Sequence, residues 1–569
     1  MHRLSANIFY LPAIVYLVAI GLLPFALSIY FSSPSGNFSS YLQLFGSKEA
    51  MEVIANTGIF AFGTAGVATV LGLVLAIFVD SLKRLKRAFS ALGYLPYMIP
   101  FTASALVWTT IYDPIYGPAD YFLSLLGLSR INWLGQPSIQ IYSATIVSIW
   151  SSIPLAFLLI LAGLSSVPKQ VREASAVDGM GMGEYYTSVA LPMSRNSILT
   201  AFLMTLIIAF GNFDLPYILN GGLSYSMATL PFLVWFQIFY ENQVAQGLAA
   251  AVILTIIVSV FAFILIRVNE RRATGSKRRL RISFRIPNRI FNLAIKMVTI
   301  LSFVFMVFPV YWMILMAFRP QSLDFVTPPI LYPATFDVST FISTAVQSEP
   351  YVITTFVASA ITMIVTLLLA APAAYSVARH GRNWLLILAI YLYTLPSASF
   401  VFGAYFIVYK LHMLNNWAAL ILTYPLFTVP FSIWTLSNFY KSLPRSFEEA
   451  ALVDGYGPFR SFYQVVMPLI RPGLVATAML SFIFSWHLLL FPLVLSETPY
   501  QFNFPPTGSF TVTVFATLFD PTSLGSSVGY NVWAQLASSG LILSLPVILL
   551  TLYSQEYLLR GLYLGGTKG

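Results

Sequence analysis

The sequence predicts an all-α integral membrane protein with twelve transmembrane helices, arranged as two parallel six-helix repeats. Three observations predict this class. Of the 569 residues, 58% are hydrophobic and only 9% are charged, whereas soluble domains carry about 25% charged residues. The apolar residues fall in runs long enough to cross a bilayer, which takes roughly 20 helical residues. A polar segment at 167–195 also recurs at 443–471, and a match at one fixed offset marks an internal repeat.

Six apolar runs precede a strongly basic segment and six follow it, and we expect each run to form one membrane-spanning helix. The first run is too long for the apolar core of a cleaved signal peptide, so we interpret it as a span. The runs lie near 8–31, 53–80, 88–112, 139–164, 197–219, 246–267, 290–318, 352–378, 384–410, 416–439, 473–495 and 530–558.

The basic segment divides the chain into two predicted domains, 1–267 and 289–569, joined by a linker at 268–288. Residues 267–296 hold ten arginines and lysines against one acid, Glu270. Lysine and arginine near span ends mark the cytoplasmic side, and the basic loops at 83–87 and 379–382 fall on that same side of the twelve-span arrangement. We therefore expect a multi-pass protein of the cytoplasmic membrane with both termini inside. Nucleic-acid binding would need a basic face on a folded domain, and the sequence predicts none.

The repeated segment predicts a hairpin of two short helices between spans 4 and 5 of each half. Proline suits the start of the first helix, glutamate suits its first turns because of the helix dipole, and glycine suits its left-handed end. A single copy would equally suit a loop lying on the membrane surface, whereas two matched copies favour a docking element. Among the identical pairs are Pro168/Pro444, Glu173/Glu449, Ala174/Ala450, Asp178/Asp454, Gly179/Gly455, Gly181/Gly457, Pro192/Pro468 and Arg195/Arg471.

This Glu-Ala-Ala…Gly…Leu-Pro pattern resembles the coupling-helix motif of permease subunits in binding-protein-dependent ABC importers. The first half of the chain looks like the first permease of carbohydrate importers of the maltose and glycerol-phosphate type, and the second half looks like its partner permease. Two subunits that are often separate would then be fused in one chain. Among the stretches that carry the resemblance are Leu95-Pro-Tyr-Met-Ile-Pro100, Phe213-Asp214-Leu-Pro-Tyr-Ile-Leu-Asn220, Pro430-Phe-Ser-Ile-Trp434 and Glu448-Glu-Ala-Ala-Leu-Val-Asp-Gly455.

The resemblance implies that each hairpin docks into a groove on a separate ATPase subunit. No Gly-x4-Gly-Lys-Ser/Thr occurs in the chain, so we expect no enzyme activity, no catalytic or metal site and no cofactor, with ATP and Mg bound by two partner ATPases. The other expected partners are an external solute-binding protein, a sugar and membrane lipid. The implied coupling residues are Glu173, Ala174, Asp178 and Gly179 in the first half and Glu449, Ala450, Asp454 and Gly455 in the second.

The resemblance also implies a sugar site midway along spans 4 and 5 of the first half. Hydroxyls and an amide supply the donors and acceptors that a sugar needs, and an aromatic ring can cover its apolar face. Taken singly, each Ser or Thr is better explained by a hydrogen bond to its own helix. The candidates are Ser148, Trp150, Ser151, Ser152, Thr205 and Asn212, with Asp214 at the outer end of span 5, where an anchoring role is slightly favoured.

The sequence departs from the family pattern at a few intramembrane positions. Leu155 and Ala209 are apolar where the family has polar groups, and the second half carries Trp486-His487-Leu488-Leu489 where the partner permease usually has Trp-Asn-Glu-Phe. For His487 we favour a hydrogen bond to a neighbouring helix over a ligand contact. Because of these departures, the resemblance points to carbohydrate through the first half only.

Two alternatives compete with a carbohydrate importer that works by alternating access. The first is a fused ABC permease for ferric ion or thiamine, against which the flanking sequences favour carbohydrate. The second is a twelve-span, ion-coupled secondary transporter, which would be expected to carry carboxylates in mid-membrane. The predicted spans are nearly free of carboxylates, and paired hairpins would have no purpose in such a protein.

Overall fold

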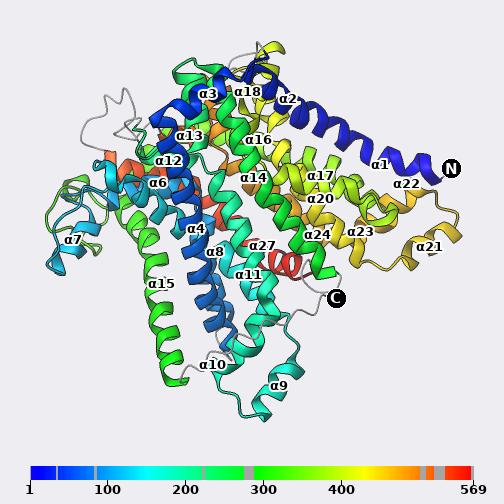
Figure 1. The fold of residues 1–569 in the computed structure, drawn as a ribbon, viewed down its shortest axis with the longest axis horizontal. Coiled ribbons are helices and arrows are strands. Elements are labelled where there is room, and N and C mark those ends of the chain that lie inside the picture. The colour runs from blue at the N-terminus through cyan, green and yellow to red at the C-terminus, as the bar shows by residue number, and fades with distance from the viewer. Residues whose placement is uncertain are drawn as a thin grey trace. The chain divides into compact units, whose positions relative to one another are not determined.

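A computed structural model describes residues 2–33, 36–82, 86–220, 224–273, 288–499, 501, 508–517 and 532–564. Throughout these ranges the regular secondary structure is helical, without β-strands (Figure 1). This confirms the predicted all-α class. Most of the predicted linker, residues 274–287, lies outside the described residues, and residues 268–273 form the end of α14 (Val244–Ala273).

Long apolar helices account for most of the predicted spans. Within the described ranges, nine helices are long and apolar enough to cross a membrane, or up to eleven if each of two bent helix pairs is one span. The bent pairs are α17 (Asn383–Thr394) with α18 (Ala398–Lys410), at 96°, and Pro458–Leu469 with α24 (Arg471–His487), at 79°. Among the long single helices are α4 (Lys48–Ser81), α8 (Pro137–Ser165), α15 (Asn288–Ala317), α16 (Ser339–His380) and α27 (Val532–Leu564).

The prediction of one continuous helix over 88–112 is wrong. This stretch forms α5 (Lys86–Tyr94), the 3₁₀ turn η2 (Leu95–Met98) and α6 (Phe101–Ile111). Pro96 and Pro100 explain the interruption, because proline has no N–H to donate and its ring clashes with the preceding helical turn.

Span 5 is also broken, and it breaks at the equivalent place in both halves. In the first half, α11 (Leu191–Phe210) ends at Phe210 with Gly211 as its C-cap, and α12 (Asp214–Leu219) follows. In the second half, α24 ends at His487 and α25 (Leu490–Leu495) follows. Phe210 and His487, the last residues of α11 and α24, lie within one residue of the fixed offset of the hairpin pairs, so the repeat extends to this break.

The helices form two compact units, and each unit combines segments that are far apart in the sequence. One unit comprises residues 1–34, 350–512 and 549–569. It therefore contains α1 (His2–Tyr16) and α2 (Leu23–Ser32) together with helices of the second half. The Tyr16 hydroxyl donates to the Leu422 carbonyl at 2.8 Å. A Cβ on Gly403 of α18 would lie only 2.3 Å from the Pro24 carbonyl oxygen, so α2 and α18 touch through their backbones.

The other unit comprises residues 35–349 and 513–548 and contains α15, the first helix of the second half. Two indole N–H groups hold α15 to first-half helices. Trp150 of α8 donates to the Met306 carbonyl at 3.1 Å, and Trp312 of α15 donates to the Thr110 hydroxyl of α6 at 3.0 Å. The opening helix of each half therefore packs with helices of the other half.

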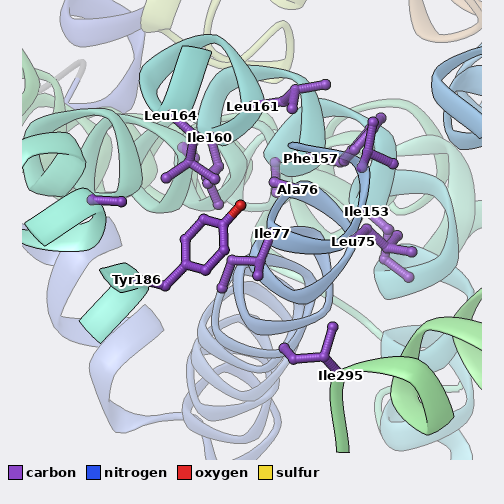
Figure 2. Packing of buried hydrophobic residues seen from close by; sticks show 14 of the residues in the cluster. Leu75, Ala76, Ile77, Ile153, Phe157, Ile160, Leu161, Leu164, Tyr186 and Ile295 are labelled. Carbon is purple, nitrogen blue, oxygen red and sulfur yellow. The ribbon is translucent and has the colours of Figure 1, made fainter. Parts of the chain in front are cut away.

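The core of this second unit lies between α4 and α8. Leu75 and Ile77 of α4 pack with Ile153, Phe157 and Ile160 of α8 in one buried cluster (Figure 2). Helices in a membrane associate through close van der Waals packing, which small interface residues allow. Because this packing fixes α8, it also fixes the polar residues that α8 carries.

Candidate functional site

The two repeated hairpins have the same local structure. The first runs through α9 (Lys169–Val177), α10 (Met182–Tyr185) and the π-helical turn η3 (Tyr186–Ala190) into α11. The second runs through α21 (Ser446–Val453), α22 (Pro458–Ser461), the π-helical turn η6 (Phe462–Val466) and α23 (Met467–Leu469) into α24. In Figure 1, α9 and α21 each project beyond the long helices of their own unit.

Both first helices end on a left-handed glycine, as predicted. Gly179 has φ +74° and Gly455 has φ +83°. The Met180 N–H bonds the Ser175 carbonyl at 3.0 Å, and the Tyr456 N–H bonds the Ala451 carbonyl at 2.9 Å. This six-to-one bond is typical of a Schellman cap. The two hairpins therefore carry the same cap, bond for bond, at equivalent positions of the repeat.

The tips of the hairpins combine exposed charge with exposed apolar side chains. Glu173, Asp178, Glu449 and Asp454 are all exposed. Val177 and Val453 are each 87% exposed although they are apolar. The valines occupy equivalent positions, so the same apolar group is presented twice. We did not select them from the sequence, although their identity at the fixed offset was a usable signal.

The predicted sugar-site residues are brought together inside the unit that contains α4 and α8. Ser148, Ser151 and Ser152 lie on α8, Thr205 lies on α11, and Asn212 follows α11; all five are buried. The Ser151 and Thr205 hydroxyls are buried and have no hydrogen-bond partner among the described residues. Such hydroxyls are available to a ligand that supplies donors and acceptors.

The helix register shows that these groups lie at similar depth. The close neighbours of Gly63 and Gly72 on α4 are Thr145 and Ala156–Phe157 on α8, so α4 and α8 run parallel. Ser197, near the start of α11, faces Gly163 near the end of α8. Ser224, which follows α11 and α12 in the chain, contacts Gln140 near the start of α8, so α11 runs antiparallel to α8. By this register, Thr205 lies within about one helical turn of Ser152.

Thr69 on α4 belongs with this group, and the sequence reasoning missed it. Interpolating between the two glycine contacts places it level with Ser152, and its buried hydroxyl also has no partner within the described part of the chain. The signal for Thr69 is its register on α4, which requires knowing that α4 packs along α8. Three unpaired hydroxyls, from Thr69, Ser151 and Thr205, thus come from three helices that pack together.

The other candidates have structural partners. Trp150 is 1% exposed, donates to Met306 and packs edge-on to Trp108 at 6.3 Å between ring centroids. The Asn212 side-chain oxygen accepts the Leu215 N–H at 3.0 Å and so caps α12, which Asp214 begins. In the second half, the His487 Nε2 atom is buried without a partner among the described residues. Ligand contacts by these residues stay predictions.

Long apolar helices and two matched polar hairpins define the class as a polytopic membrane protein with a duplicated hairpin. A family model, "Binding-protein-dependent transport system inner membrane component", matches residues 68–275 and again residues 364–562. The chain therefore belongs to this family of transport permeases and carries the family unit twice.

Each of the relatives named below aligns with a little less than half of this chain. The chain is 31% identical over 265 residues to the trehalose transport system permease protein SugB of Mycobacterium tuberculosis, and the match covers 46% of this chain and 92% of SugB. It is 30% identical over 276 residues to the diacetylchitobiose uptake system permease protein DasC of Streptomyces coelicolor, covering 48% of this chain and 95% of DasC. It is 28% identical over 239 residues to the trehalose/maltose transport system permease protein MalF of Thermococcus litoralis, and the match covers 42% of this chain and 81% of MalF. Two such permeases fill the length of this chain, as expected for a fusion.

Proposed function

We propose that this chain is the complete membrane part of a sugar importer, in which two separate ATPase subunits act on the two hairpins. The single observation that carries the proposal is the duplicated hairpin, which repeats its glycine cap and its exposed valine at one offset. A family unit that occurs twice in one chain supports one transporter per chain. An external binding protein delivers the solute, and both termini lie on the cytoplasmic side, as the basic loops indicate.

The substrate class follows from the relatives and from the hydroxyls at mid-membrane. The relatives are named for trehalose, maltose and diacetylchitobiose. Thr69, Ser151 and Thr205 supply unpaired hydroxyls at one depth, and hydroxyls can both donate to and accept from a sugar. We propose that a mono- or oligosaccharide binds there, with Ser148, Ser152 and Asn212 beside it, while the helices alternate between outward-open and inward-open states.

The docking role of the hairpins rests on their exposed apolar groups. An apolar side chain that is 87% exposed gains free energy when a partner covers it, by about 25 cal/mol per Å² of buried apolar surface. Exposed glutamates beside it provide specificity, because charged groups at an interface select complementary partners. Each hairpin thus offers one apolar anchor, Val177 or Val453, next to one acid, Glu173 or Glu449.

The docking role is tested by purifying the tagged chain from its own cells in mild detergent and measuring ATP hydrolysis of the eluted complex. Wild type should elute with an ATPase subunit, and the Val177→Asp/Val453→Asp double variant should lose it, because charge replaces both apolar anchors. Leu126→Asp is the matched control, since Leu126 is also an exposed apolar residue (75%) but lies outside the hairpins. If wild type elutes without hydrolytic activity, or if the hairpin variant keeps it, the proposal fails.

The sugar site is tested separately by transport kinetics in vesicles. Thr69→Val, Ser151→Ala and Thr205→Val remove the unpaired hydroxyls and approximately keep side-chain volume, so folding should be preserved. Each loss should raise the solute concentration for half-maximal transport several-fold, since losing one hydrogen bond costs about 1 kcal/mol. Thr145→Val is the control, because the Thr145 hydroxyl already donates to the Ile141 carbonyl at 2.7 Å. Equal effects at all four positions would refute the placement.

A further inference from the structure

Each hairpin is tied to a long helix of its own unit by an ion pair whose carboxylate is largely buried. In the first half, the pair joins Arg172 of α9 to Asp80 near the end of α4. The Asp80 side chain is only 5% exposed, and it also accepts from the Tyr186 hydroxyl at 2.9 Å and contacts Lys86 at 3.4 Å. We call Asp80, Lys86, Arg172 and Tyr186 the first ion-pair cluster. Three donors converge on one carboxylate, so the hairpin cannot leave α4 without exposing or unpairing a buried charge.

In the second half, the pair joins Glu448 of α21 to Arg379 at the end of α16. The Arg379 Nε and Glu448 Oε1 atoms lie 2.6 Å apart, with 7% and 13% of the two side chains exposed. The Tyr375 hydroxyl donates to the other Glu448 oxygen at 2.9 Å, and Arg379 also donates to the Leu443 carbonyl at 2.9 Å. We call Tyr375, Arg379 and Glu448 the second ion-pair cluster.

Both clusters join the first helix of a hairpin to the end of a long helix, but the donor side and the acceptor side are exchanged between them. Arg172 and Glu448 each stand immediately before the matched pair Glu173/Glu449, so they are the same position of the repeat with opposite charge. In the first cluster the hairpin donates, through Arg172 and Tyr186, and the long helix accepts. In the second cluster the long helix donates, through Tyr375 and Arg379, and the hairpin accepts.

The reversed polarity favours pairing of each hairpin with the long helix of its own half. An exchanged pairing would bring Arg172 to Arg379 and Glu448 to Asp80, and like charges brought together are unfavourable, most of all beside the buried Asp80. Discrimination of this kind uses repulsion against the wrong partner as well as attraction to the right one. A chain that carries two hairpins with the same backbone structure has a use for it, because both hairpins are present whenever either one docks.

We propose that the two ion-pair clusters are the mechanical links of the transporter: each holds its hairpin rigidly to α4 or α16, so that a displacement of the hairpin moves that helix. This inference rests on the proposed function of the hairpins. The four ion-pair residues are positioning residues, since they act through the hairpin. Without the link, an ATPase subunit still binds the exposed side of the hairpin and hydrolyses ATP, but the long helix does not follow.

Two adjacent glutamates separate docking from linkage. Glu449 is exposed and available to a partner, whereas Glu448 is directed to Arg379. The test measures solute transported per ATP hydrolysed in vesicles that contain the intact complex. Glu448→Arg should keep the ATPase subunits bound and keep hydrolysis within about twofold of wild type, while transport per ATP falls by about tenfold. Glu449→Lys should instead weaken retention of the ATPase subunit.

Exchanging the two charges of an ion pair should restore the transport per ATP that each single variant loses. Arg379→Glu should uncouple as Glu448→Arg does, and the Arg379→Glu/Glu448→Arg double variant should recover most of the transport per ATP. The same holds for Asp80→Arg, Arg172→Glu and their combination, each in a Lys86→Gln background because Lys86 would repel an arginine at position 80. If the single variants transport normally while ATPase subunits stay bound, or if the exchanged pairs do no better than the singles, the linkage proposal is overturned. If ATPase subunits fail to bind the wild-type chain, the proposed function itself fails.

A direct structural readout needs no ATPase. The chain has no cysteine, so spin labels on introduced cysteines report one distance without interference. Labels at Ala176→Cys in the hairpin and Ser81→Cys in α4 should give a narrow distance distribution in the otherwise wild-type chain. Adding Arg172→Glu should broaden it, and adding Asp80→Arg as well should narrow it again. An unchanged distribution in the Arg172→Glu chain would show that the ion pair does not hold the hairpin.

Discussion

At Gly72 the backbones of α4 and α8 lie close together, so replacing it with alanine tests the packing that positions the candidate sugar site. A Cβ at this position would lie 2.7 Å from the Phe157 backbone nitrogen and 2.9 Å from the Ala156 Cβ. Comfortable contacts between such atoms are about 3.5–4.0 Å. The obstacle is backbone on the facing helix, so no side-chain rotation relieves it, and α8 must move away by roughly 1 Å.

The expected cost combines two opposing effects. Overpacking of a tight interface costs about 1–3 kcal/mol, while alanine improves the intrinsic helix propensity by up to about 1 kcal/mol over glycine. Gly66 is the matched control, because it lies on the same helix and a Cβ there would meet nothing within 4 Å. Gly66→Ala should therefore be neutral or stabilising. Because both variants gain the same propensity, the overpacking cost alone should make Gly72→Ala less stable than Gly66→Ala, by about 2 kcal/mol.

The assay is the apparent midpoint of thermal unfolding in detergent, followed by size-exclusion chromatography after heating. We expect Gly72→Ala to unfold about 2–3 °C below Gly66→Ala, since a unit of this size shifts its midpoint by only about 1–2 °C per kcal/mol. Solute transport at a temperature where both remain folded should fall only in Gly72→Ala, since α8 carries Ser148 and Ser152. Equal midpoints and equal transport in the two variants would refute the reasoning from helix contact to site geometry.

The remaining predictions concern three other places. Arg319→Leu should destabilise the protein by about 3–5 kcal/mol in thermal unfolding, because it leaves the fully buried Asp324 carboxyl unpaired, and Arg319→Leu/Asp324→Leu should recover most of the loss. Gly403→Ala should detach α2 from α18, since its Cβ would lie 2.3 Å from the Pro24 oxygen; proteolysis should then release the N-terminal segment sooner. Gly179→Ala should cost about 1–2 kcal/mol, because its φ of +74° is strained for alanine; a hairpin whose hydrogen exchange is unchanged would contradict this.

Features set by local sequence could be predicted. The hairpin ends followed from Gly179 and Gly455, because only glycine takes a positive φ without strain, and the structure has both glycines there. The all-α membrane class followed from the length of the apolar runs. The interruption at 95–100 was also encoded locally, by Pro96 and Pro100, but the apolar composition of the stretch concealed it.

Features set by distant partners could not be predicted. Nothing in residues 8–31 indicates that they pack with the second half, as the bond from Tyr16 to Leu422 shows they do. Arg379 served the sequence analysis only as a topology signal, whereas its partner, Glu448, lies 69 residues further along the chain. Trp150 was expected to face a sugar, and its N–H is taken by a carbonyl 156 residues away, so only the fold reveals its partner.

The central claim is that one chain supplies both permease units of a transporter and that each hairpin engages one ATPase subunit. The most direct test is the native mass of the complex purified in mild detergent. We predict one 63.1 kDa chain with two ATPase subunits, and a loss of one ATPase subunit when only one hairpin carries the Val177→Asp or Val453→Asp change. A complex with two copies of the chain per two ATPase subunits would contradict it, because each chain would then use only one of its hairpins.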